Sequence, residues 1–396
     1  ALDANTTGAY NTAVGYAALG ANTTANNNNA FGEQSLLANT TGSENNAFGR
    51  YALTTCTTGN NNNAMGYAAL RMLTTGTYNL AIGNYAGDAI TTGQSNTVIG
   101  NNAGTALTTP NNNTVLGAAA LYTATTGANN VAVGYAALYT NGTASHNTAI
   151  GYAAGYNNTT GAYNTAVGYQ TLNANTTGSD NVAVGAHALE NNTTAEWITA
   201  VGYKAGQANT TGEGLVAVGA AALIKNTTGD KNTACGYDSL GENTTGASNV
   251  AVGYFALREA TTANENTAVG VSAGYSLTTG SSSTMVGRMA MNNATTAWGS
   301  VAIGEGALYS NTTGYKNVAC GRQAMYNITT GVQSVAVGYQ ALFNCTTSNS
   351  NTAVGFYALV NATGNNNTAV GEQAGASISS GTNNLMLGID SGSSAS

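Results

Sequence analysis

The side chains that most often carry chemistry are few in this chain, and they do not gather at any point of it. Its 396 residues include 2 histidines, 4 cysteines, 16 acidic and 9 basic residues. His146 and His187 lie at different positions of the sequence repeat described below, and we expect both to be ordinary surface residues. Solenoid enzymes concentrate carboxylates, Arg or His at a cleft, whereas the acidic residues here are scattered. The sequence therefore predicts that the protein is not an enzyme.

The four cysteines are too widely spaced for a disulfide or a metal site. Cys235 and Cys320 share one repeat position five repeats apart, and Cys56 and Cys345 share another position 17 repeats apart. A disulfide requires Cα atoms within about 7 Å, so we expect all four to be unpaired within the chain. The sequence has no Cys-x-x-Cys pair and no recurring Asp-rich calcium loop. We therefore expect neither a metal site nor a cofactor.

The composition argues against several classes of protein. Only 6% of the residues are charged and the net charge is -7, so the basic patches of a nucleic-acid-binding protein cannot form. With 42% apolar residues the chain is unlike a disordered one. No apolar run approaches the roughly 20 residues of a membrane span. The chain begins at Ala1 without a methionine or a signal peptide, so we expect it to be a processed or partial chain.

A 17-residue repeat fills the sequence. With Gly15 as position 0, matching glycines recur at this constant spacing up to Gly355; one residue is then deleted before Gly371, and Gly388 completes 23 repeats. The consensus is Asn-Thr-Ala-Val-Gly-Tyr-x-Ala-Leu-x-x-Asn-Thr-Thr-Gly-x-x. These residue types favour turns and short strands, and the unit is too short for a helical hairpin. The sequence predicts an all-β protein, a single continuous parallel β-solenoid over residues 1–396 with about 23 coils.

Each repeat position becomes a column along the solenoid, and the period-two alternation of a strand assigns columns to the core or to the surface. Position -1 is apolar in all 23 repeats, so it is predicted to face the core, with position -3 on the same side of the strand. Position +4 is mostly Leu and is also predicted to point inward. The predicted core residues include Val14, Val167, Val184, Leu19 and Leu138.

The same alternation points position -2 outward, although this position is Ala in 19 of the 23 repeats. At about 4.8 Å per rung, a stripe of Ala at -2, with Ala also at +3, exceeds the apolar patch that monomers normally expose. Each thin coil also buries few aliphatic side chains against the entropy cost of ordering it. We therefore expect lateral association with further copies of this chain. The predicted inter-chain contacts are Ala166, Ala183 and Ala200.

Position +7 is Asn in ten repeats and Leu, Ile, Ala or Cys in the other thirteen. A position that exchanges Asn with Leu faces the core, where stacked amides can bond from rung to rung. Four of the seven coils with Gly at +4 carry Leu or Ile at +7, against two of the other sixteen, and close packing explains that compensation. The predicted asparagine ladder includes Asn158, Asn175, Asn192, Asn209 and Asn226.

Further columns are predicted to lie at the surface. A tyrosine stripe at +1 could contact a glycan or protein, or it could be a solvated stacking column that shields the strands. Thr is nearly constant at +8 and +9, and alternation turns only one of these two files outward. Position +6 is polar and variable, and its Asn-x-Thr sequons are the better acceptors for glycans. These possible glycosylation sites are Asn157, Asn191, Asn293, Asn327, Asn344 and Asn361.

The repeat core, seen in Asn-Thr-Ala-Val-Gly at 164–168 and Asn-Val-Ala-Val-Gly at 130–134, resembles the YadA-type head repeats of trimeric autotransporter adhesins. It resembles still more closely the Asn-Thr-Thr-Gly-rich repeats of phage-like tail-fibre proteins. The resemblance covers nearly the whole chain and implies a left-handed β-roll, wound as a homotrimer, that serves surface attachment. The period of the present repeat is longer than that of the adhesin family.

Two functions follow from these observations. The first is an extracellular structural fibre or adhesin shaft at a cell or virion surface, which associates with itself and contacts a cell-surface or glycan ligand, without nucleic acid or a membrane span. The second is a solenoid that recognises a flat surface such as ice, or a glycan, through its Thr or Tyr columns. A thermal-hysteresis assay would distinguish ice binding from the first function.

Overall fold

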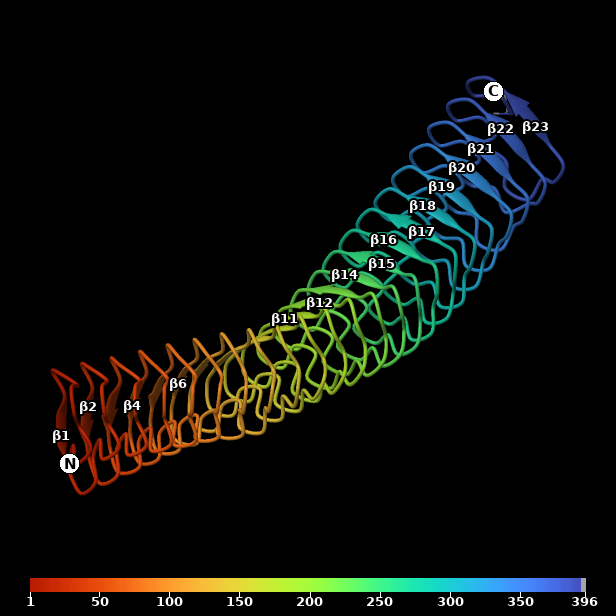
Figure 1. Ribbon diagram of the computed structural model, residues 1–396. Helices are drawn as coiled ribbons and strands as arrows, with labels where there is room; N and C mark the ends of the chain where they lie inside the picture. The colour runs from red at the N-terminus through yellow and green to blue at the C-terminus, as the bar shows by residue number, and fades with distance from the viewer. Residues whose placement is uncertain (393–396) are drawn as a thin grey trace. The chain divides into compact units, whose positions relative to one another are not determined.

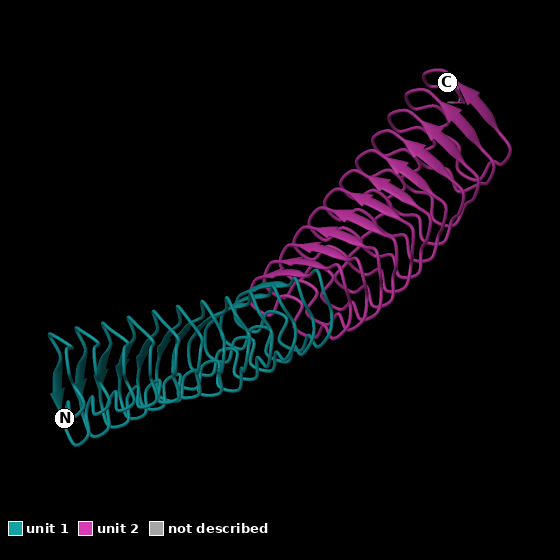
Figure 2. Ribbon diagram, viewed as in Figure 1, with its two compact units in different colours: residues 1–197 teal, residues 198–396 magenta. Residues whose placement is uncertain are grey.

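The computed structural model describes residues 1–392, and the chain divides into two compact units, residues 1–197 and residues 198–396 (Figure 2). In each unit the described residues form three-residue strands joined by turns, without helix. Each unit is a parallel β-solenoid in which one repeat makes one coil, so the predicted all-β solenoid is confirmed. The handedness and the trimer stay predictions. No helix among these residues is long and apolar enough to cross a membrane.

Unit 1 contains eleven strands, one in each coil (Figure 1). They are β1 (Thr12–Val14), β2 (Asn29–Phe31), β3 (Asn46–Phe48), β4 (Asn63–Met65), β5 (Leu80–Ile82), β6 (Thr97–Ile99), β7 (Thr114–Leu116), β8 (Val131–Val133), β9 (Thr148–Ile150), β10 (Thr165–Val167) and β11 (Val182–Val184).

Unit 2 contains twelve strands of the same length. They are β12 (Thr199–Val201), β13 (Val216–Val218), β14 (Thr233–Cys235), β15 (Val250–Val252), β16 (Thr267–Val269), β17 (Thr284–Val286), β18 (Val301–Ile303), β19 (Val318–Cys320), β20 (Val335–Val337), β21 (Thr352–Val354), β22 (Thr368–Val370) and β23 (Leu385–Leu387).

Within each unit the strands pair in parallel, and each residue lies beside its equivalent one coil away. Ala166 of β10, for example, pairs with Ala149 of β9 and with Ala183 of β11. Backbone hydrogen bonds continue this register through the turns, as where the Thr159 amide donates to the Thr176 carbonyl at 2.9 Å. Equivalent side chains therefore stack into continuous columns within each unit, and the character of each column decides what the solenoid presents inside and outside.

Three positions in most coils, -5, +2 and +4, adopt left-handed backbone conformations whether or not they are glycine. In one coil they are Tyr163, Gln170 and Leu172, with φ of 58°, 50° and 50°. The glycine at position 0 has a different requirement, because Gly117 has φ of 147° and a Cβ there would overlap the carbonyl oxygen of Gly134 in the next coil. This contact between successive backbones explains why every repeat has glycine at position 0.

The structure reverses the predicted phase of the strands. Val14 is 55% exposed, and Val167 and Val184 are partly exposed, so these residues do not form the core that the sequence predicted. Leu19 and Leu138, at 0% and 2% exposure, are buried as predicted. The apolar column at -1 therefore lines the outer face of the sheet and not the interior.

The alanine column at -2 lies inside the coil. Ala166, Ala183 and Ala200 are 2%, 0% and 0% exposed, so the predicted inter-chain contacts are wrong. A coil closed by so short a repeat is thin, and Leu at +4 fills most of the space opposite the strand. Position -2 therefore accepts Ala, while the larger side chains at -1 are accommodated on the outside.

The residues that replace Ala at position -2 indicate that this position faces the core. Position -2 is Val or Met in four strands, at Val98, Val115, Met285 and Met386. A Cβ built on Gly104, at position +4, would lie 3.3 Å from Val98, and one built on Gly274 would meet Met285. Larger residues at -2 thus fill space left by glycine at +4, as a shared core position requires.

Candidate functional site

The columns at -3 and -1 form the outer face of each strand row, and we call this surface the sheet face. Among the 23 positions at -1 none is polar or charged, and the 23 positions at -3 are Thr, Val, Asn or Leu. Within unit 1, Met65 of β4 is 52% exposed and Leu116 of β7 is 46% exposed. The sheet face of each unit is therefore a continuous, uncharged and largely apolar strip.

The sheet face of unit 1 is hollowed between β3 and β5. A cavity of about 100 Å³ opens there beside Phe48, Met65 and Ile82. Phe48 also stacks on Phe31 of β2, with ring centroids 5.0 Å apart and planes 7° apart. In unit 2 the strip includes Cys235, which is exposed. These features make the face uneven enough to fit one partner surface better than another.

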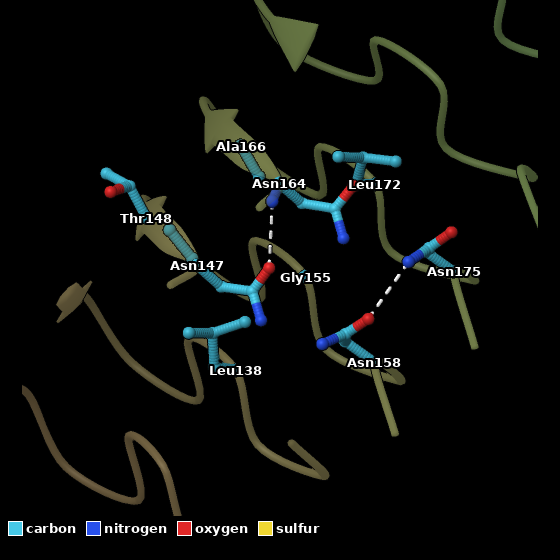
Figure 3. Close-up of a pocket in the computed structure, with 10 residues that line it drawn as sticks. Leu138, Asn147, Thr148, Gly155, Asn158, Asn164, Ala166, Leu172 and Asn175 are labelled. Atoms are coloured by element: carbon cyan, nitrogen blue, oxygen red, sulfur yellow. Dashed lines mark hydrogen bonds between the residues drawn. The ribbon is translucent and has the colours of Figure 1, made fainter. Parts of the chain in front are cut away.

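The asparagine ladder at +7 lies inside the coils, as the exchange of Asn with Leu predicted. Asn158, Asn175, Asn192, Asn209 and Asn226 are all at most 2% exposed. In unit 1 the Asn175 amide donates to Oδ1 of Asn158 at 2.9 Å (Figure 3) and to the Gly178 carbonyl at 2.9 Å. In unit 2 Asn226 donates in the same way to Asn209 at 2.9 Å. The ladder satisfies buried amides that would otherwise be costly.

Three runs of this ladder end with an unpaired oxygen. Oδ1 of Asn39, Asn243 and Asn311 is buried and has no hydrogen-bond partner. The next rung is Cys56, Ala260 or Ile328 respectively, and none of these side chains supplies an amide donor. The donor always comes from the following coil, so a run loses its last acceptor bond wherever Asn gives way to another residue.

A second asparagine ladder lies at position -4, and it was not predicted from the sequence. Asn147 and Asn164 are 1% and 6% exposed, and Oδ1 of Asn147 accepts a bond of 2.9 Å from the Asn164 backbone amide (Figure 3). The Asn147 amide also donates to the Gly161 carbonyl of the next coil at 2.9 Å. The signal was present, because position -4 becomes Ile198 and Leu215 in two successive repeats, the same exchange that identified position +7.

A small interior cavity lies at one of the two coils in which Gly at +4 is accompanied by Asn at +7 and not by Leu or Ile. Gly155 replaces Leu at +4, with Leu138 and Leu172 above and below it, but position +7 in that coil is Asn158 and not Leu or Ile. The resulting cavity is about 10 Å³ and is also lined by Ala149 (Figure 3). That volume holds at most about one water molecule, so it is a packing defect and not a ligand site.

Tyrosines form stacked columns on the outside of unit 1. Tyr152 at +1 stacks on Tyr135 and Tyr169, with centroid distances of 5.4 and 5.3 Å. Tyr139 at +5 stacks on Tyr122 and Tyr156 at 5.0 and 4.8 Å. Offset or parallel stacking of this kind stabilises neighbouring rungs. The rings cover the turns next to the sheet face, so a stacking role accounts for these columns without a ligand.

The two threonine files differ: the threonines at +9 are exposed, whereas most of those at +8 are partly exposed and bond to the backbone of the next coil. The hydroxyl of Thr159 at +8 donates to the Thr176 carbonyl of the next coil at 2.9 Å, and this bond recurs along both units, for example from Thr244 to Thr261 at 3.0 Å. Thr160 and Thr177 at +9 are exposed. The +9 file is thus the more exposed of the two, although the +8 file is not buried as strict alternation predicted.

The asparagines of the six predicted sequons lie at the surface. Asn191, Asn344 and Asn361 are exposed. The remaining three are partly exposed, namely Asn157, Asn293 and Asn327. In unit 2 Asn327 donates to Asn344 at 3.3 Å, and Asn344 donates to Asn361 at 2.9 Å. Position +6 is therefore accessible to modification, whereas the sequons that start at +7 are buried in the ladder.

In the part of the chain that the structure describes, the two histidines have separate neighbours and the cysteines are free. His146 stacks on Tyr163 at 4.8 Å, and His187 lies 3.1 Å from Glu190. All four cysteines are free, and no cluster of three or more His, Cys, Asp or Glu side chains suited to a metal is found within residues 1–392. Burial raises the pKa of the Cys56 thiol to about 11 and raises the pKa of Cys345. Both buried thiols are therefore protonated near neutral pH.

No protein-family model matches the chain, and a search of curated proteins finds no match either. The likeness to adhesin and tail-fibre repeats therefore stays a prediction from the repeat pattern, and the surfaces described above carry the functional argument.

Proposed function

We propose that this chain is a non-catalytic structural shaft of an extracellular fibre or adhesin, which associates laterally with further copies of itself through the sheet face. A homotrimer is the assembly that the resemblance to adhesin head repeats implies. The observation that carries the proposal is the uncharged apolar strip at -1 and -3. It replaces the alanine stripe as the contact surface, because the alanines lie in the core.

The size of the strip supports a partner of similar length. Eleven strands at about 4.8 Å, with side chains about 10 Å across, give the sheet face of unit 1 an area of about 500 Å². Patches of this size on monomers are at the upper end of the observed range and are often functional. A second copy presents the same continuous strip with the same rung spacing, so every rung can meet an equivalent rung.

A variant with charges on the sheet face tests the assembly. Val167→Glu with Val184→Glu places two carboxylates on the strip, which must be desolvated on association. We expect the double variant to be a single chain by native mass spectrometry, while the unsubstituted protein is an oligomer. The matched control is Thr160→Glu with Thr177→Glu, which adds the same charge to the exposed +9 file and should leave the oligomer intact.

Two results would contradict the proposal. A stable single-chain mass for the unsubstituted protein would show that the strip has no partner of its own kind. Dissociation of both double variants would show that net charge, and not the position of the charge on the sheet face, controls association.

Recognition of a flat surface is the second candidate, and a specific observation favours it. The +9 file presents threonine in 21 successive repeats from Thr7 to Thr347, and its side chains in the described coils are exposed. A regular hydroxyl file of this kind is suited to an ordered surface such as ice. Thermal hysteresis that disappears when Thr160 and Thr177 become Glu, and that persists with Glu on the sheet face, would favour this function over the shaft.

A further inference from the structure

A hollow on the surface of unit 1 lies away from the sheet face and is not needed for lateral assembly. Its volume is about 310 Å³, and its boundary includes Tyr51, Tyr67, Ala68, Arg71 and Tyr85. We call it the tyrosine notch. Its residues come from columns +1, +2, +5 and +6 of successive coils, which form the turns that follow the strands. The volume is in the range of small-molecule sites, about 300–1,000 Å³.

The notch exists because one small residue interrupts a column of large ones. At position +2, Tyr51 and Tyr85 flank Ala68, and Ala68 is 1% exposed and forms the floor. Next to this floor the hollow is lined by the short side chains of Thr54 and Thr55. Their hydroxyls are bonded to the backbone, to the carbonyls of Tyr51 at 2.7 Å and Arg71 at 2.8 Å respectively.

The walls of the notch are held in place by contacts among themselves. Tyr67 meets Tyr51 edge-on at 5.8 Å between centroids and Tyr85 at 5.2 Å. A hydrogen bond to Tyr67 raises the pKa of the Tyr85 phenol. The Arg50 guanidinium lies 4.5 Å from the centre of the Tyr51 ring. The rings are therefore positioned before any ligand arrives, which lowers the entropy cost of binding.

The charges around the notch are balanced. Arg71 is paired with Asp88 through two bonds of 2.8 and 3.1 Å, and Arg50 is paired with Glu33 at 3.1 Å. Neither cation is left to attract an anion, and neither carboxylate is left to attract a cation. The notch therefore offers aromatic faces together with tyrosine hydroxyls, the Gln34 amide and the Arg71 guanidinium, without net charge.

We propose that the tyrosine notch binds a ring of a neutral carbohydrate. The C–H face of a sugar ring packs on aromatic side chains, and its hydroxyls both donate and accept hydrogen bonds, which matches this combination of rings and polar groups. An anionic sugar would find no unpaired cation in the notch with which to form an ion pair. This site would make the shaft a carbohydrate-binding surface in addition to a structural one.

Unit 2 contains a smaller hollow built from the same columns, which supports the choice of the first one. There Gly306 at +2 lies between Met289 and Gln323, with Tyr309 and Tyr326 on the +5 side, and the volume is about 110 Å³. That is below the range of small-molecule sites. Of these two hollows, the one in which two tyrosines flank an alanine has the volume of a small-molecule site.

The test compares two filling substitutions at the same repeat position. Ala68→Tyr closes the notch, and tyrosine is compatible with the backbone because Tyr51 and Tyr85 have φ of 63° and 57° against 56° at Ala68. The matched control is Ala136→Tyr, at the same position with φ of 54° but outside the notch. The full-length chain and both variants are applied, fluorescently labelled, to an array of immobilised neutral, sialylated and sulfated glycans.

We expect the unsubstituted chain and Ala136→Tyr to bind a shared set of neutral glycans, and Ala68→Tyr to lose at least tenfold of that signal while its circular dichroism is unchanged. A second variant, Tyr67→Ala, should also lose the signal. Binding to no neutral glycan, binding to anionic glycans alone, or retention of the signal by Ala68→Tyr would each overturn the proposal. Because native mass reports assembly separately, failure here leaves the proposed shaft intact.

Discussion

The internal cavity beside Gly155 allows one substitution to be tested with opposite expected signs at two equivalent positions. Ala149→Val adds two methyl groups to a position that lines the cavity of about 10 Å³. The chain already contains this arrangement elsewhere, because Val98 occupies the same position in the coil where Gly104 replaces Leu. Ala183→Val makes the same change in a coil whose +4 residue, Leu189, is 0% exposed and leaves no such space.

The magnitudes follow from packing. Each buried methylene contributes about 0.8 kcal/mol, so two methyl groups could add about 1.6 kcal/mol, and incomplete fit reduces this to about 1 kcal/mol for Ala149→Val. Overpacking a filled core costs about 1–3 kcal/mol, so Ala183→Val should be destabilising by that amount. The two variants should therefore differ by about 2–4 kcal/mol, although they are the same substitution in the same column.

Amide hydrogen exchange measured by mass spectrometry on the full chain is the suitable assay. Repeat proteins open locally, so a melting temperature of the whole chain would dilute the effect. We expect the peptides around Ala149 to exchange about 5-fold more slowly in Ala149→Val, and those around Ala183 to exchange at least about 5-fold faster in Ala183→Val. If position -2 faced solvent, both changes would be nearly neutral. Destabilisation by both would show that the cavity is already filled.

Two further predictions test the interior and the strand phase. Asn175→Ala leaves Oδ1 of Asn158 without its donor and should destabilise the coil by about 1–3 kcal/mol, measured by the same exchange assay. Asn311→Ala should destabilise its coil by less, because Oδ1 of Asn311 has no hydrogen-bond partner to lose. Burial raises the pKa of Cys56 to about 11, so only about 0.1% of this thiol is ionised at pH 8, and iodoacetamide should modify exposed Cys235 long before Cys56. The Val167→Glu, Val184→Glu chain is used for this comparison, because assembly would cover Cys235; equal labelling of the two thiols would contradict the burial assigned to them.

Much of the architecture could be predicted because it depends on periodicity. An invariant glycine in every repeat, with turn-forming and β-branched residues between, predicts stacked coils whatever the detailed path of the chain. Position +7 was also assigned correctly, because Asn exchanges there with Leu and Ile. The same exchange at position -4, with Ile198 and Leu215, is the corresponding signal for the second ladder.

The orientation of the strands could not be obtained from alternation alone. In a three-residue strand, two of the positions share one face and one lies on the other, so the pattern Thr-Ala-Val fits either phase. The apolar residues at -1 favoured the wrong orientation of the strand, because the more hydrophobic face of a strand was expected to be the buried face. The candidate contact surface was consequently placed on the alanines, and the tyrosine notch was not foreseen because it depends on how residues from several coils meet.

The sequence by itself therefore determined the repeat, the coil length, the columns and the scarcity of catalytic side chains, all of which are properties of residue type and spacing. The tertiary structure alone decided which face of each strand lies inside. The reason is volume: Leu at +4 crosses the thin coil and leaves room opposite for Ala166, 2% exposed, but not for a column of Val, Ile, Phe and Met. The larger side chains are thereby placed outside, and they give each unit the apolar face through which we propose that it associates.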